Sequence, residues 1–114
     1  MPELPSPTFL VDLTKVRANC EILAEIREQA GCRIVHALKA FSLPQAFPTM
    51  RPHLDGCCAS GPWEARLAHE EFGGAVLTCA PAYSEADLRK LLEISTHLDF
   101  NSPGQWQAFR DQVV

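Results

Sequence analysis

The sequence predicts an α/β fold with a parallel sheet, because short apolar runs alternate with longer helical patterns at a regular interval. The expected strands end near Lys39, Ser60, Pro81 and Asn101, so successive ends are 21, 21 and 20 residues apart. Continuous apolar runs are typical of strands covered on both faces. A doubly wound sheet and a (β/α)₈ barrel both fit this interval. No apolar run is followed by a G-x-G-x-x-G or Walker sequence, which disfavours a doubly wound sheet that binds nucleotides.

The chain is too short to form a complete (β/α)₈ barrel. A (β/α)₈ barrel has eight units in about 250 residues, whereas these 114 residues supply about four. An open half-barrel would leave parallel strand edges unpaired. We therefore expect the chain to be part of a larger domain, and we expect poor solubility or partial unfolding when it is isolated.

Composition excludes several classes of protein. The chain is 46% hydrophobic with a formal net charge of −4 and no basic stripe, so it is globular and has no electrostatic footprint for nucleic acid. Its apolar runs are far shorter than the roughly 20 residues that cross a bilayer, and the first residues do not form a signal peptide. The five cysteines form no C-x-x-C pair and the four histidines lack ligand spacing. We expect a cytoplasmic chain with reduced thiols and no metal site.

The first half of the chain begins with a short extended run, Thr8–Val11, before Asp12, which is a good helix N-cap. Gly31 is a plausible stop signal for the helix that follows, and residues 33–41 form an apolar strand candidate. The apolar face of that helix is predicted from three- and four-residue spacing and consists of Leu13, Val16, Cys20, Leu23 and Ile26.

The middle of the chain is punctuated by proline. Residues 42–54 have a helical pattern in which Pro44 fits a first turn, whereas Pro48 and Pro52 would break a regular helix. Residues 54–60 form the next strand candidate. A helix is then expected from Pro62 to Phe72, ending at the glycine pair 73–74.

The last third repeats the same alternation. Residues 75–80 and 97–100 are strand candidates. Between them Ser84, with Asp87 three residues on, resembles a capping box and opens a helix that contains Leu88, Leu91 and Leu92. Ser102 is the expected N-cap of a final helix with proline at its first position.

Lys39 is the unusual residue, because it is a charged side chain at the end of an apolar strand candidate. Alternation places it on the same strand face as Val35 and Ala37. An amine among apolar neighbours has a lowered pKa and can form a Schiff base with a carbonyl compound. Ala37 is small enough to leave room for a flat ring. The alternative is a lysine that extends into water and buries only its stem.

The stretch from Ala37 to Ser42 resembles the cofactor-lysine strand of the alanine racemase-like, fold-type III pyridoxal-phosphate enzymes. More narrowly, the chain as a whole resembles the carboxynorspermidine (carboxyspermidine) decarboxylases. The similarity runs from about Pro7 to Phe109. Further segments that carry it are Leu54-Asp55-Gly56, Ala59-Ser60, Trp63 to Leu67, Glu71 to Gly74, Pro81-Ala82-Tyr83 and Phe100-Asn101-Ser102.

The resemblance implies a fold and a site. It implies that residues 1–114 form the N-terminal part, about four βα units, of a pyridoxal-phosphate-binding (β/α)₈ (TIM) barrel. Lys39 would form the Schiff base with pyridoxal 5′-phosphate, and Ala37 and Ser60 would face the cofactor. The rest of the barrel, a second β-rich domain, the phosphate-binding loop, the acid that pairs with the pyridine nitrogen and the substrate-carboxylate contacts would lie beyond residue 114. The full-length form would be a homodimer.

Two residues depart from the family pattern. Cys79 stands with Ala80 where a more polar pair is expected, and His36 replaces an aliphatic residue. Strand parity turns His36 away from Lys39, so we interpret it as a core histidine that faces the helices.

Other conspicuous side chains have ordinary structural interpretations. Tyr83 and Asn101 follow strand ends, where an aromatic residue that packs in a turn and a turn-forming amide are common. Trp63 and Trp106, at expected helix starts, are interpreted as core residues. Three acidic residues are interpreted as a solvated helix face: Glu64, Glu70 and Glu71.

The expected function is therefore pyridoxal-phosphate-dependent decarboxylation of carboxynorspermidine or carboxyspermidine in polyamine biosynthesis, with a small amino-acid-type substrate and no nucleic-acid or membrane partner. Another fold-type III decarboxylase or an amino-acid racemase is an alternative. A pyridoxal-phosphate carrier without turnover, and an α/β domain with an inert Lys39, are alternatives of other classes. The 114 residues alone are expected to be inactive.

Overall fold

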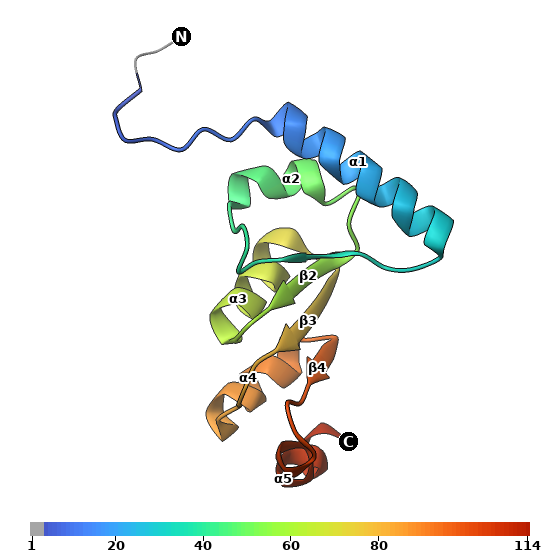
Figure 1. The fold of residues 1–114 in the computed structure, drawn as a ribbon. Coiled ribbons are helices and arrows are strands. Elements are labelled where there is room, and N and C mark those ends of the chain that lie inside the picture. The colour runs from blue at the N-terminus through green and yellow to red at the C-terminus, as the bar shows by residue number, and fades with distance from the viewer. Residues whose placement is uncertain (1–3) are drawn as a thin grey trace.

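The computed structural model describes residues 4–114 and contains a four-stranded parallel sheet in the order β1-β2-β3-β4. Figure 1 shows the strands side by side, with α1 and α2 at one end of the molecule and β4 and α5 at the other. The prediction of an α/β fold with four parallel strands is confirmed. The strands are β1 (Val35–Ala37), β2 (Gly56–Ala59), β3 (Ala75–Cys79) and β4 (His97–Asp99).

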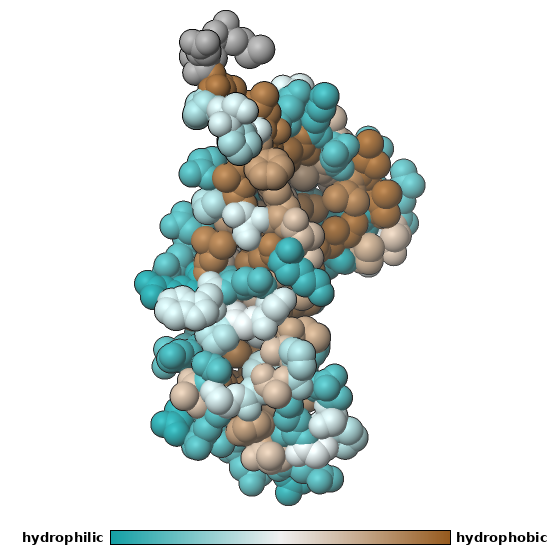
Figure 2. Space-filling view, turned by 60° about the vertical axis from the view of Figure 1, so that its left-hand side comes forward, coloured by the Kyte–Doolittle hydropathy of each residue, from teal (hydrophilic) through white to brown (hydrophobic). Residues whose placement is uncertain are grey.

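Helix α1 (Leu13–Ala30) has the predicted caps. The Asp12 carboxylate accepts hydrogen bonds from the backbone N–H groups of Thr14 and Lys15, at 2.9 and 3.3 Å, and Gly31 ends the helix with a φ of 62°. The predicted apolar face is, however, only partly covered. Within it Cys20 is buried and Val16 half-buried, whereas Leu13, Leu23 and Ile26 are exposed. Figure 2 shows hydrophobic residues gathered on the surface at this end of the molecule.

The proline-rich segment forms two short pieces, the 3₁₀ turn Pro44–Ala46 and helix α2 (Phe47–Met50), so the expected interruption of a regular helix is confirmed. The helix predicted from Pro62 to Phe72 is also present. It begins as α3 (Pro62–Leu67), and its last five residues, Ala68–Phe72, form a π-helix before the glycine pair.

The last two helices begin at the predicted serines. In α4 (Glu85–Ile94) the Ser84 hydroxyl accepts from the Asp87 backbone N–H at 3.1 Å. The Asp87 carboxylate accepts from that hydroxyl instead of from the Ser84 backbone, so the motif is an N-cap and not a full capping box. Helix α5 (Pro103–Val113) is capped by Ser102.

Strand β1 is much shorter than the sequence predicts. Only Val35–Ala37 pair with β2, and residues 38–40 form a turn in which the Ala40 N–H donates to the Ala37 carbonyl at 3.1 Å. The Leu38 N–H still donates to the Cys58 carbonyl at 3.1 Å, which holds this turn against β2. Lys39 therefore lies in the turn after the strand and not within it.

The two faces of the sheet differ in how well they are covered. The face that packs against the helices carries buried side chains from β2 and β3: Cys57, Ala59, Val76 and Thr78. The opposite face, which we call the open face, carries half-buried or exposed side chains: Val35, Ala37, Cys58, Ala75, Leu77, Cys79, His97 and Asp99. The radius of gyration is 16.7 Å, against about 13 Å for a compact domain of this length. Within residues 4–114, helices therefore cover one face of the sheet and leave the other partly accessible to solvent.

Asp55 connects three elements at the amino end of the sheet. Its carboxylate accepts from the Ile34 N–H at 2.8 Å and from the Arg27 guanidinium at 3.4 Å. Its backbone N–H donates to the Ile34 carbonyl, and its carbonyl accepts from the Ala75 N–H. These bonds join the end of α1 to the entry points of β1 and β3, so Asp55 has a structural role.

We predict that Asp55→Ala lowers the free energy of unfolding by about 2 kcal/mol, because a charged acceptor of two part-buried donors is lost. Urea denaturation followed by circular dichroism measures this. Asp111→Ala is the matched control, since the Asp111 side chain is 92% exposed in α5, and it should change stability by less than about 0.5 kcal/mol. Equal effects of the two substitutions would contradict the role of Asp55.

Candidate active site

The carboxyl ends of the four strands meet at one edge of the open face, which is where active sites gather in parallel α/β proteins. The register places Ala37 opposite Cys58 and Cys79 opposite Asp99. Lys39 follows β1 at this edge. One amine, two thiols and one carboxylate are thus brought to the same edge from four consecutive strands.

Lys39 is exposed, so the expectation that apolar neighbours shield its amine is wrong in this structure. The reason is that Lys39 lies in the turn beyond the last paired residue, and the side chains that residues 4–114 place on the open face are half-buried or exposed. Its position at the carboxyl end of β1 agrees with the sequence analysis. A carbonyl compound in solution can reach the amine.

Cys58 is a neighbour of the Lys39 turn that the sequence analysis did not single out. Burial raises the pKa of the Cys58 thiol, the negative charges of Cys79 and Asp99 raise it further, and the positive charge of Lys39 lowers it. The thiol therefore stays protonated at neutral pH, next to the lysine. Only the register shows this proximity, because Cys58 is 19 residues from Lys39 in the sequence and no local pattern connects them.

The two other predicted cofactor residues lie at the same edge in different environments. Ala37 is half-buried as the last residue of β1, and its small side chain leaves the open face accessible. Ser60 is exposed just after β2, and its backbone N–H donates to the Glu64 carboxylate at 2.7 Å. Glu64 is half-buried, so its interpretation as part of a solvated face is wrong, whereas Glu70 is exposed and pairs with Arg66 at 2.7 Å.

Tyr83 is buried, as its interpretation as an aromatic residue that packs in a turn predicts, and it joins the ends of β3 and β4. Its buried hydroxyl accepts from the Ala80 N–H at 3.1 Å and lies 2.9 and 3.1 Å from the carbonyl oxygens of Asp99 and Thr78, to which it can donate. Burial raises the pKa of Tyr83. The phenol therefore holds the carboxyl ends of two strands in place.

His36 packs against the helices, as predicted. Its ring stacks on Phe72 at a centroid distance of 6.4 Å, meets Phe47 edge-on, and bonds the carbonyl of Phe41 through Nε2. Burial raises the pKa of the neighbouring Cys57 to about 12. Cys57 is a buried core residue and His36 is half-buried, and both lie on the covered face.

The interpretation of the two tryptophans as core residues is wrong for Trp63, which is 82% exposed, and only partly right for Trp106, which is 39% exposed and meets Phe100 edge-on. Asn101 is exposed in the bend before α5, as expected of a turn amide.

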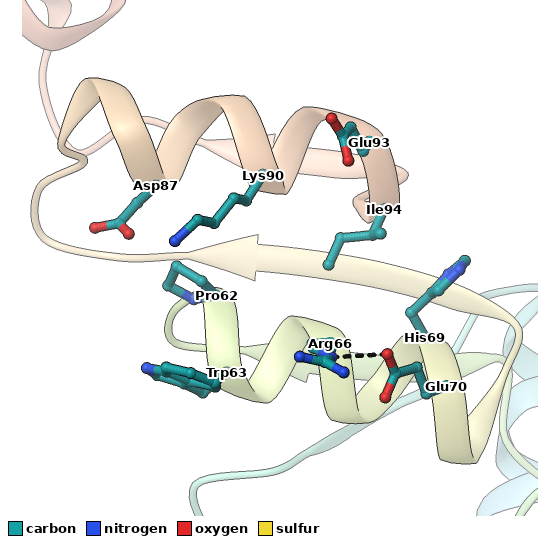
Figure 3. Close-up of a pocket in the computed structure, with 9 residues that line it drawn as sticks. All are labelled: Pro62, Trp63, Arg66, His69, Glu70, Asp87, Lys90, Glu93 and Ile94. Atoms are coloured by element: carbon teal, nitrogen blue, oxygen red, sulfur yellow. Dashed lines mark hydrogen bonds and ion pairs between the residues drawn. The ribbon is translucent and has the colours of Figure 1, made fainter.

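A groove of about 340 Å³ lies between α3 and α4, on the covered side of the sheet. Figure 3 shows Lys90 and Ile94 pointing from α4 toward α3, and the ion pair between Arg66 and Glu70 across from them. No residue of the open face lines this groove, so it is separate from the edge that carries Lys39.

Within residues 4–114, no three histidine, cysteine or acidic side chains come close enough to hold a metal ion. In the same described part of the chain, no helix combines the length and apolar character that spanning a bilayer requires.

Comparisons with known proteins agree on one group. A carboxyaminopropylagmatine decarboxylase of Synechocystis is 40% identical over 110 residues, and a carboxynorspermidine/carboxyspermidine decarboxylase of Campylobacter jejuni is 33% identical over 111 residues. The crystal structure of C. jejuni carboxynorspermidine decarboxylase, complexed with norspermidine, superposes with a TM-score of 0.93 at 33% identity over 96% of this chain.

Over the segment that it spans, this chain is a homologue of the carboxynorspermidine/carboxyspermidine decarboxylases. The matches cover 96% and 97% of the chain but only 28% and 29% of those two relatives, so the chain spans less than a third of their length. It matches the N-terminal portion of the solved decarboxylase. No family model matches the sequence.

We predict that Tyr83→Phe lowers the free energy of unfolding by about 1–3 kcal/mol, because the buried Ala80 N–H loses its acceptor. Urea denaturation measures the loss. The control is Phe109→Leu, which shortens a half-buried aromatic side chain that makes no hydrogen bond. It should lower the free energy of unfolding by less than Tyr83→Phe does. An unchanged free energy of unfolding in Tyr83→Phe would show that the phenol does not hold these strand ends.

Proposed function

We propose that this chain provides the cofactor lysine and the first βα units of a pyridoxal-phosphate-dependent decarboxylase that acts on carboxynorspermidine or carboxyspermidine in polyamine biosynthesis. The supporting observation is the place of Lys39, an accessible amine at the carboxyl edge of the open face, in a chain homologous to decarboxylases with such substrates in their names. In the proposed enzyme, residues 1–114 form the N-terminal part of a (β/α)₈ barrel.

The residues at this edge fit an aldehyde cofactor. Lys39 supplies the amine, and Ser60 offers a hydroxyl at the end of β2. The small side chain of Ala37 leaves space for a flat ring beside the end of β1. When bound, pyridoxal 5′-phosphate supplies an electron sink for the electron pair that remains after carbon dioxide is lost. The role proposed for this chain is that the Lys39 amine would hold the cofactor at this edge.

The open face supports the barrel proposal. Its half-buried side chains near the amino end include Val35, Ala75 and Leu77, which border a recess of about 100 Å³ with Arg33 and His97. Inward-facing apolar layers of this kind fill the interior of a (β/α)₈ barrel. We propose that further barrel strands cover this face, that the complete enzyme is a cytoplasmic homodimer, and that it uses no metal.

A second candidate substrate is carboxyaminopropylagmatine, because the Synechocystis relative named for that substrate is 40% identical to this chain, compared with 33% for the C. jejuni enzyme. Release of carbon dioxide from each carboxylated amine by the complete enzyme discriminates between the candidates. Release from none of them, with the cofactor bound, would favour a carrier without turnover.

We predict that pyridoxal 5′-phosphate followed by borohydride labels Lys39 several-fold more than Lys15 and Lys90. All three lysines are exposed, so accessibility alone predicts equal labelling. Peptide mass spectrometry measures the adduct at each site. Lys39→Arg should abolish the preferred adduct and leave the other two unchanged. Equal labelling of the three lysines would overturn the proposed role and favour a domain with an inert Lys39.

A further inference from the structure

Trp63 exposes its indole beside the proposed cofactor site. It is 82% exposed at the start of α3, where Figure 3 shows it next to Pro62. It also borders a shallow hollow of about 220 Å³, which it shares with Ser60, Gly61 and Glu64. Ser60 is the residue of this turn that is expected to face the cofactor, so the hollow adjoins that site at the carboxyl end of β2.

The local sequence explains why the indole and a carboxylate meet at this hollow. Gly61 precedes α3 without a side chain and Pro62 begins the helix, so neither residue offers a side chain that caps it. Glu64, at the third position of the helix, reaches back and accepts the Ser60 N–H at 2.7 Å through Oε2. This bond holds the carboxylate against the turn, one residue after the indole. A carboxylate accepts several hydrogen bonds, so Glu64 can take a further donor from a ligand.

The charge at the hollow favours a cation. Of residues 4–114, the four that line it include one carboxylate and no positively charged side chain. The groove between α3 and α4, which Trp63 also borders, contains Arg66 and Lys90, and Arg66 is paired with Glu70 at 2.7 Å. An ammonium group is attracted both to a carboxylate and to the face of an aromatic ring, most strongly to that of tryptophan. The hollow therefore suits an alkylammonium group better than an anion.

We propose that Trp63 and Glu64 form a subsite for the amine tail of the substrate, beside Ser60 at the edge of the cofactor site. This inference rests on the proposed function, because carboxynorspermidine and carboxyspermidine are amino acids that carry further amine groups. Those amines are protonated at neutral pH, as the lysine amine is. The pair therefore discriminates substrates with an amine tail from ordinary amino acids, which leave the subsite empty.

The test measures the binding of norspermidine, the triamine in the C. jejuni structure, to the complete enzyme by calorimetry. We expect Trp63→Leu to weaken this binding about tenfold, because the cation loses its aromatic face. Trp63→Phe should restore part of the loss, since a phenyl ring attracts a cation less strongly than an indole does. Trp106→Leu is the matched control. Trp106 meets Phe100 edge-on and does not line the hollow, so this variant should leave the affinity unchanged.

A second variant, Glu64→Gln, tests the carboxylate separately. Glutamine keeps an oxygen that can accept the Ser60 N–H but loses the charge. It should therefore also weaken norspermidine binding, by a factor that shrinks as the salt concentration is raised.

An unchanged affinity for norspermidine in Trp63→Leu would overturn the inference. If that variant also dissociated the dimer, the indole would belong to a subunit contact instead. The proposed function fails differently: norspermidine binding depends on Trp63 as expected, while the wild-type enzyme releases no carbon dioxide from carboxynorspermidine. Where both hold, Trp63→Leu should raise KM about tenfold with little change in kcat, because the lost contact is made equally in the ground state and the transition state.

Discussion

The short parallel pairing between β1 and β2 is the constraint on which the rest of the site depends. Three residue pairs, ending with Ala37 opposite Cys58, and one further bond from the Leu38 N–H fix where the chain turns. That turn sets the position of Lys39. Because the pairing is so short, its alignment relies on Asp55, whose bonds at the opposite end of the sheet hold the entry to β1.

The two faces of the sheet have different roles: the covered face contributes to stability, and the open face carries reactive side chains. Apolar burial, which contributes most of the stabilisation of a fold, is concentrated on the face toward the helices, where Cys57, Val76 and Thr78 are inaccessible to solvent. The open face carries the side chains that can react. Tyr83 spans both roles, because its buried hydroxyl fixes the strand ends from which Cys79 and Asp99 project.

Local signals in the sequence predicted local structure well. The side chains of Asp12, Ser84 and Ser102 each cap the helix that was expected after them, because capping depends on residues within one turn. Features set by residues far apart in the sequence could not be predicted from local signals. The end of β1 depends on pairing with β2, and the exposure of Trp63 depends on whether another element covers α3. The same holds for Cys58, whose place beside Lys39 is a matter of register.

The placement of the Lys39 turn against β2 at Cys58 is the central claim, and o-phthalaldehyde tests it directly. This reagent joins a neighbouring amine and thiol into a fluorescent isoindole with loss of two water molecules. The structure predicts an isoindole that links the peptides containing Lys39 and Cys58, and its disappearance in Cys58→Ala. A wild-type chain that yields no such link, or one whose Lys39 joins only to Cys20 or Cys32, would contradict the register and the site built on it.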